Sequence, residues 1–261
     1  MNLESYLPIA EELGYCFQIL NRYVVSLVEN KYTNTNLFEF NNESIIRPID
    51  IDFVKLSNLW EKISNNNNIF SIVKDENYFK WRYKDIPYHK YLFFGNYVDG
   101  IIISRIDKID DTNLNVFRII EILPLETDVW ACNKTDKYLK FKNLFSNVLN
   151  YAKSVNCILS DFYISYDFLE HFLLDNNYIN IINNHIYKCP KIFTNTELMC
   201  GDINFICKSK YKKLYYVKSN TDTDFINNLD FQYNFKKNIT LEEGNTFAKL
   251  SGDYNPVHID N

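Results

Sequence analysis

This 261-residue chain lacks the closely spaced cysteines that bind zinc or form a redox-active pair. It has six cysteines but no CxxC pair, and they stand far apart, at positions 16, 132, 157, 189, 200 and 207. We therefore expect no metal site and no redox motif. Reduced thiols, as in a cytosolic protein, are the expected state of these cysteines.

Long apolar runs and a basic N-terminus are also absent. No run approaches the roughly 18 apolar residues that span a bilayer, and the N-terminal stretch contains Glu4 and Pro8 without a basic start. We therefore expect neither a membrane segment nor a signal peptide, and we expect the protein in the cytoplasm. The net charge of −5 does not indicate a nucleic-acid partner, because such a partner calls for a basic surface.

Aromatic residues, in contrast, are abundant, with 20 Tyr and 20 Phe in an aromatic share of 16%. Hydrophobic residues reach 46% and charged residues 23%, which is typical of a soluble globular protein. A chain of this length can form one large domain or two ordinary ones.

Hydrophobic periodicity predicts the alternating helices and strands of an α/β (α+β) protein. A long amphipathic helix over residues 137–155 follows three strands at 91–96, 100–106 and 115–123. The other expected helices cover residues 2–13, 52–63, 76–83 and 166–176, and the other expected strands cover 16–28, 45–49, 158–164, 179–187 and 204–208. This order predicts a mixed sheet with helices on both of its faces.

The middle of the chain resembles the GNAT acyltransferases. Residues 78–83 read YFKWRY and are followed by Pro87 and Tyr91, which is similar to the YLRWRY…P…Y pattern of a bacterial GNAT-like subfamily. The element order resembles the same fold. Members of that subfamily carry two such lobes, so the resemblance implies the end of a first lobe over 1–36, a second GNAT-like lobe over 37–218 and a linker over 219–235.

The loop that binds acyl-CoA in GNAT enzymes has no counterpart here. In that family a loop of the pattern R/Q-x-x-G-x-G/A precedes the long helix and holds the pyrophosphate with backbone amides. The corresponding residues 124–135 contain no glycine, and Glu126 and Asp128 would repel phosphate. The sequence therefore favours a second lobe that does not bind the cofactor.

Two residues of the YFKWRY segment, Trp81 and Arg82, allow two interpretations. They could contact a substrate, since an indole and a guanidinium both bind ligands well. The interpretation that we favour is structural: the aromatic face of this helix packs on the sheet, and Arg82 pairs with an acid.

The end of the chain resembles a different family. Residues 247–260 read FAKLSGDYNPVHID and match the FAxLSGDxNPxHxD motif of MaoC-like (R)-specific enoyl-CoA hydratases. Thr240 and Glu243 just before it form the capping box of a helix. This resemblance implies that residues 236–261 are the N-terminal piece of a hotdog domain, truncated in this chain.

The chemistry of hydration explains the residue types in this motif. Addition of water to an α,β-unsaturated thioester needs a base for the water and an acid at the α-carbon. The resemblance assigns this catalytic work to Asp253 and His258. Gly252 and Asn255 would serve substrate binding, because Gly252 leaves room for the thioester and Asn255 fixes the turn. The expected substrate is a coenzyme A thioester, and no metal is needed.

Together the two resemblances imply an acyl-CoA-handling fusion of a GNAT-like acyltransferase with an enoyl-CoA hydratase or dehydratase. The chain would then be a fragment that begins inside one domain and ends inside another. Small acyl-CoA molecules are the expected partners, and a homodimer is expected through the hotdog domain, because such domains commonly pair. Two alternatives stay open: a non-catalytic, degenerate GNAT-like scaffold, or a truncated and inactive gene product.

Overall fold

A computed structural model describes residues 16–29, 34–40, 44–67, 71–86, 89–108, 113–131, 133–165, 169–181, 204–207 and 217. The chain divides into two compact units, Met1–Phe225 and Ile226–Asn261, and all described residues belong to the first.

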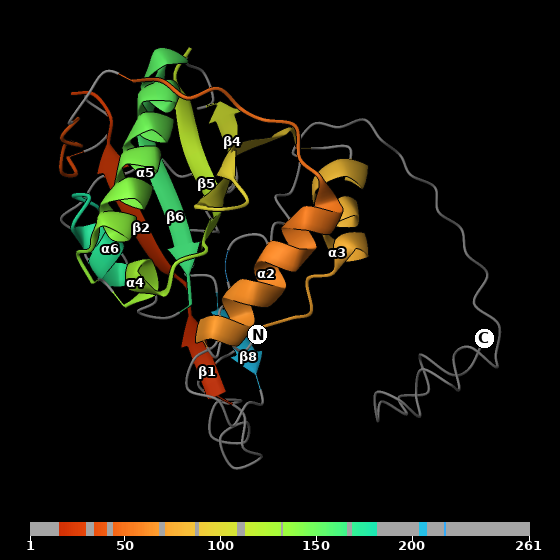
Figure 1. The fold of residues 1–261 in the computed structure, drawn as a ribbon. Helices are drawn as coiled ribbons and strands as arrows, with labels where there is room; N and C mark the ends of the chain where they lie inside the picture. Colours follow the sequence, from red (N-terminus) through yellow and green to blue (C-terminus); the bar gives the residue numbers. More distant parts are fainter. Residues whose placement is uncertain are drawn as a thin grey trace, which may run out of the picture. The chain divides into compact units, whose positions relative to one another are not determined.

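A six-stranded mixed sheet forms the centre of this unit, with the strand order β3-β4-β5-β6-β2-β7 (Figure 1). The strands are β2 (Asn21–Ser26), β3 (Tyr91–Asn96), β4 (Gly100–Lys108), β5 (Asn115–Pro124), β6 (Cys157–Ile164) and β7 (Ile179–Asn180). Strands β5 and β6 are parallel, and the other neighbours in this sheet are antiparallel. A separate antiparallel pair joins β1 (Cys16–Ile19) to β8 (Asn204–Cys207).

One face of the sheet is covered by the crossover that makes β5 and β6 parallel. It contains α4 (Thr127–Trp130) and the long α5 (Asp136–Ser154), which crosses in front of β2 and β6 in Figure 1. Thr135 caps α5 by accepting a hydrogen bond from the backbone N–H of Tyr138. Phe145 of α5 packs edge-on against Phe172 of α6 (Glu170–Leu174), at 5.1 Å between ring centroids.

The opposite face is covered by α2 (Phe53–Asn67), α3 (Glu76–Lys80) and a π-helical turn, η1 (Trp81–Asp85). The buried residues of α2 follow the helical period: Leu56, Leu59, Trp60 and Ile63. Adjacent residues of a strand point to opposite faces of the sheet, so the contacts of Phe93 and Phe94 in β3 show which helix covers each face. The Phe93 ring contacts Phe53 of α2, whereas the Phe94 ring contacts Tyr151 of α5. The prediction of a mixed sheet with helices on both faces is therefore confirmed.

Most predicted elements agree with the structure, and β3 has the predicted bounds. The strand expected at 45–49 is wrong, because the chain has no helix or strand there, although the N–H of Ile49 donates to the carbonyl of Phe93. Pro48 explains the difference, since proline has no N–H for a ladder of hydrogen bonds. The helix expected at 76–83 changes to a π-helix at Trp81. The expected helix at 2–13 lies outside the described residues.

Strand β2 lies inside this sheet, between β6 and β7. Its register with β6 runs from Asn21↔Ile164 to Ser26↔Leu159. The strand that the GNAT resemblance assigns to a preceding lobe is thus hydrogen-bonded to a strand of the following one. The domain boundaries at residues 36, 218 and 235 stay predictions. In the described parts of the chain, no helix has both the length and the apolar character that crossing a bilayer requires.

Gly100, the first residue of β4, provides a test of this packing. Its φ is +137°, and a Cβ atom there would lie 2.6 Å from the carbonyl oxygen of Leu123 and 2.8 Å from the Cα of Pro124. We predict that Gly100→Ala lowers the free energy of unfolding by about 1–3 kcal/mol, because both the backbone and its surroundings are strained. Urea unfolding followed by circular dichroism measures this change. The exposed neighbour substitution Val98→Ala is the control, and an equally small effect of both would contradict the tight packing.

Candidate functional site

The site residues that the MaoC resemblance assigns, Gly252, Asp253, Asn255 and His258, lie outside the described residues. The catalytic pair therefore stays a prediction. The described residues instead show the helix N-terminus where the resemblance would place a cofactor, a gap between two parallel strands, and one buried group of charges.

The first place is the N-terminus of α5, which follows the glycine-free loop. Helix N-termini attract anions, because their free N–H groups and the helix dipole are positive. Here carboxylates of the protein itself lie next to this end. Asp128 accepts a hydrogen bond from the capping hydroxyl of Thr135 at 2.9 Å, and Glu126 accepts one from Lys137 at 2.8 Å. The position that would receive a pyrophosphate is thus bordered by the carboxylate of Asp128 and by the ion pair between Glu126 and Lys137.

The second place is the gap between β5 and β6. Their parallel pairing runs from Asn115↔Cys157 to Ile119↔Phe162 and does not include the last residues of either strand. In open α/β sheets, ligands bind outside the carboxyl ends of such strands. In this protein Ile164 forms a bridge to Val217. Because β2 occupies the other edge of β6, Val217 lies on the edge that faces β5, and its side chain is fully buried.

A β-bulge in β5 produces the buried group of charges. Ile103 and Ser104 are adjacent in β4, yet their partners are Glu121 and Ile119, so Ile120 is an extra residue. Without the bulge, Glu121 would point toward α5. With it, Glu121 lies on the opposite face of the sheet.

On that face, Glu121 joins three elements. Its Oε1 atom lies 2.8 Å from the Lys74 ammonium and accepts a hydrogen bond from the Tyr83 hydroxyl at 2.7 Å. The side chains of Lys74 and Glu121 are both fully buried. The Lys74 ammonium also lies 4.7 Å from the centre of the Trp60 ring, a cation–π distance. Helix α2, the segment before α3 and the π-helix are therefore all tied to the centre of β5.

Burial controls the ionisation of this group. It lowers the pKa of Lys74, although the negative charge of Glu121 and the hydrogen bond to it oppose the shift. Burial also raises the pKa of Tyr83 well above its ordinary value, and the charge of Glu121 adds to that effect. Tyr83 is consequently a neutral hydrogen-bond donor at any physiological pH.

Ion pairs continue across the same face of the sheet. The guanidinium of Arg118 lies 3.4 Å from both Asp161 and Asp107. Arg22 extends the network at one end, at 2.9 Å from Asp161, and Arg105 extends it at the other end, at 2.9 Å from Asp107. The network thus links β2, β6, β5 and β4. Arg118 and Asp161 are completely buried, so these charges hold the strands together and do not face a ligand from solvent.

The adjacent residues Trp81 and Arg82 differ in their burial. Trp81 is 55% exposed, so it is not part of the aromatic face that packs on the sheet. The packed aromatic residues of this segment are Phe79 and Tyr83, whose rings stack at 6.0 Å. Arg82 is buried, and its guanidinium lies 5.9 Å from the ring centre of Tyr91. Its expected pairing with an acid stays a prediction.

Sequence reasoning missed the group formed by Lys74, Glu121 and Tyr83. A signal for part of it existed: Arg118 and Glu121 interrupt an otherwise apolar strand, and Asp161 interrupts β6. Charged residues inside strands that are buried on both faces need partners. Nothing in the spacing, however, indicates that Lys74 is such a partner.

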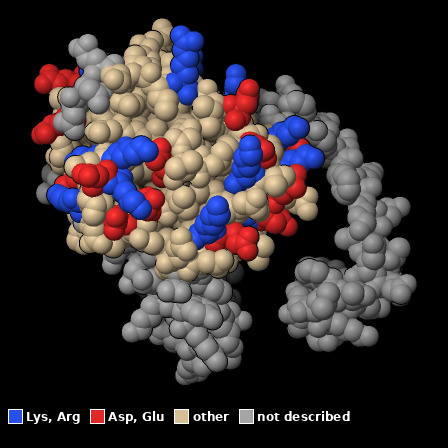
Figure 2. All heavy atoms as spheres, in the orientation of Figure 1, with Lys and Arg blue, Asp and Glu red and all other residues tan. Residues whose placement is uncertain are grey.

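The described surface offers neither a metal-binding cluster nor a uniformly basic patch in the view shown. Among the described residues, no three His, Cys, Asp or Glu side chains come together in a way that could hold a metal ion. Figure 2 shows Lys and Arg next to Asp and Glu over the visible face. Comparisons with protein-family models, with curated proteins and with solved structures gave no match to this chain. The family resemblances therefore rest on the sequence motifs and the topology.

The buried pair can be tested with a double-mutant cycle. We predict that Lys74→Met and Glu121→Leu each lower the free energy of unfolding by about 3–5 kcal/mol, because each leaves an uncompensated buried charge. The double variant should lose clearly less free energy of unfolding than the sum of the losses in the two single variants. Denaturant unfolding of the four proteins measures the coupling.

The control for this cycle is Lys55→Met. It removes the exposed ion pair between Lys55 and Asp52, whose charged atoms lie 3.7 Å apart. It should cost less than about 1 kcal/mol. Additive effects of Lys74→Met and Glu121→Leu would show that the two charges do not depend on each other.

Proposed function

We propose that this chain belongs to an acyl-CoA-handling protein that combines a GNAT-like domain with a MaoC-like enoyl-CoA hydratase or dehydratase. The six-stranded domain serves as a scaffold in this protein and does not bind coenzyme A. The hydratase part carries the chemistry.

The observation that carries the hydratase proposal is the match of residues 247–260 to every fixed position of the MaoC motif. In the proposed reaction, Asp253 and His258 activate a water molecule, whose oxygen bonds to the β-carbon of the enoyl thioester. A proton reaches the α-carbon, so that one water is added across the double bond. The Asn255-Pro256 turn would hold the pair in place, and Gly252 would let the thioester approach the backbone.

The topology supports the GNAT-like assignment of the larger domain. Three antiparallel strands lead through a long helix to a parallel strand, as the resemblance implies. Two observations support a scaffold without cofactor. Asp128 and Glu126 border the N-terminus of α5, and Val217 occupies the edge of β6 that faces β5. At the N-terminus of α5 a pyrophosphate would be repelled by Asp128 and would have to compete with Glu126 for Lys137. Beside β6, a ligand would meet the buried side chain of Val217.

The hydratase proposal predicts that the protein turns over crotonyl-CoA. Asp253→Ala and His258→Ala should each lower kcat by about 10²–10⁴-fold, the usual contribution of a general acid or base. Loss of the enoyl absorbance measures the rate, and circular dichroism checks that the variants fold. Asp230→Ala, which lies outside the motif, is the control and should keep full activity. Equal activity of the wild type and Asp253→Ala would refute the assignment.

The scaffold proposal predicts that acetyl-CoA leaves the larger domain unchanged. Amide hydrogen exchange with and without acetyl-CoA should show the same protection over residues 124–140. This readout is local, so binding to the hydratase part does not disturb it. New protection at the start of α5 would show that the domain binds the cofactor after all.

A further inference from the structure

Two of the six cysteines occupy directly opposite positions in the pair formed by β1 and β8. These strands are antiparallel, and their register runs from Cys16↔Cys207 to Ile19↔Asn204. Directly opposite residues of an antiparallel pair lie on the same face of the sheet. The fold therefore brings together two cysteines that stand far apart in the sequence, where their spacing does not indicate a pair.

The spacing of an antiparallel pair suits a disulfide bond. The Cα atoms of directly opposite residues are about 4.5 or 5.5 Å apart, depending on whether the two residues exchange hydrogen bonds. Disulfides join residues whose Cα atoms are about 4.4–6.8 Å apart. Both kinds of opposite pair fall within this range, so Cys16 and Cys207 can be joined while the two strands keep their register.

A covalent bond at this place has a large effect, because the pair of strands is weak by itself. Strands β1 and β8 contain four residues each and form a separate two-stranded sheet. Two strands alone are marginally stable in water. The chain between Cys16 and Cys207 also contains all six strands of the larger sheet, so the pairing has to close a long loop.

Both strands of the pair are connected to the larger sheet. Strand β1 continues through Leu20 directly into β2, which lies between β6 and β7. Strand β8 precedes Val217, which forms the bridge to Ile164 of β6. A bond between β1 and β8 therefore joins the strand that enters the larger sheet to the segment that leads to the edge of β6.

We propose that Cys16 and Cys207 form a reversible disulfide, a redox-sensitive switch that joins β8 to β1. The two thiols are the resting state, and the oxidant is a low-molecular-weight disulfide such as oxidised glutathione. The thiolate of one cysteine attacks this disulfide and releases one glutathione thiolate, which takes up a proton. The thiolate of the other cysteine then attacks the mixed disulfide and releases the second glutathione. Two protein thiols and one small disulfide thus become one protein disulfide and two small thiols.

Cys157, the first residue of β6, is unsuited to this exchange. Its side chain is buried, and burial raises the pKa of its thiol to about 12. Almost none of this thiol is ionised at neutral pH, and the thiolate is the species that attacks a disulfide. Cys157→Ala is therefore the matched control for substitutions of Cys16 and Cys207.

The test exposes the full chain to oxidised glutathione, blocks the remaining thiols with iodoacetamide and maps the disulfides by peptide mass spectrometry. Digestion with trypsin and Asp-N separates Cys207 from Cys200, because Asp202 lies between them. We expect one peptide pair joined through Cys16 and Cys207. This bond should be absent in Cys16→Ser and in Cys207→Ser, and it should form in Cys157→Ala as it does in the wild type.

The bond should also slow amide hydrogen exchange over residues 16–19 and 204–207, because the pair of strands then opens less often. We expect exchange there to be roughly tenfold slower or more, and the melting temperature to rise by roughly 5–10 °C, since the bond restricts the unfolded chain. Dithiothreitol should reverse both effects. In Cys207→Ser the same oxidant should change neither.

Three outcomes overturn the proposal. The first is that no bond joins Cys16 to Cys207 in the oxidised wild type, a result that does not depend on how the variants fold. The second is that either cysteine pairs mainly with Cys189 or Cys200. The third is that the bond forms without slowing exchange in β1 and β8. Neither Cys16 nor Cys207 belongs to the motif assigned to hydration, so failure here leaves the hydratase proposal intact.

Discussion

The described domain depends on the interaction between Glu121 and Lys74 across one face of its sheet. A carboxylate in the centre of a buried strand is costly, and only a close cation and further hydrogen bonds make it tolerable. The bulge at Ile120 turns Glu121 toward Lys74 and Tyr83. These contacts, with the Trp60 ring next to the Lys74 ammonium, tie α2, the segment before α3 and the π-helix to the sheet. The polar contacts between the helices on this face and the sheet therefore depend on one extra residue in β5. The ion pairs around Arg118 extend the same principle to β2 and β6.

Sequence periodicity was sufficient to predict most of the helices and strands, because local residue patterns determine them. Helix α5 repeats apolar residues at helical spacing, and β3 to β6 are apolar runs between turn residues. The failures have local causes too. Pro48 prevents a strand that its apolar neighbours suggest, and the change from α- to π-helix at Trp81 has no signature in the residue pattern. The position of β2 in the sheet, by contrast, is a matter of tertiary pairing, which periodicity does not reveal.

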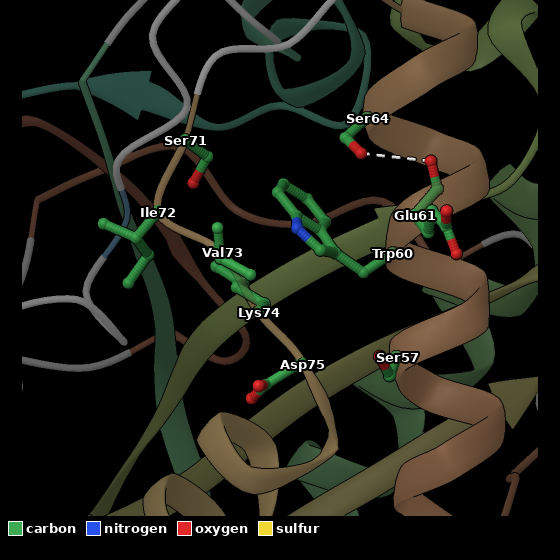
Figure 3. Close-up of a pocket in the computed structure, with 9 residues that line it drawn as sticks. All are labelled: Ser57, Trp60, Glu61, Ser64, Ser71, Ile72, Val73, Lys74 and Asp75. Carbon is green, nitrogen blue, oxygen red and sulfur yellow. Dashed lines mark hydrogen bonds between the residues drawn. The ribbon is translucent and has the colours of Figure 1, made fainter.

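The candidate sites also differ in whether their residues are close in the sequence or only in the fold. The motif around Asp253 and His258 is readable because its residues are adjacent in sequence, and its geometry stays a prediction. Glu121 and Lys74 are 47 residues apart, and only the fold brings them together. A cavity of about 340 Å³ beside Lys74 has the same origin, since its two walls come from α2 and from the segment before α3 (Figure 3). A resemblance can name a chemistry from a short motif, but long-range contacts decide where charges are buried and where they stay accessible.

The place of β2 also has a consequence for the order of folding. Strands β3, β4 and β5 follow one another with short connections, so they can pair as soon as they are made. Strand β2 is synthesised before them, yet its partner β6 ends at Ile164. Until β6 emerges, β2 has no partner in the sheet, and the loop that must then close contains the whole β3–β5 meander. The pairing of β2 with β6 is thus a late, long-range step in the folding of each molecule.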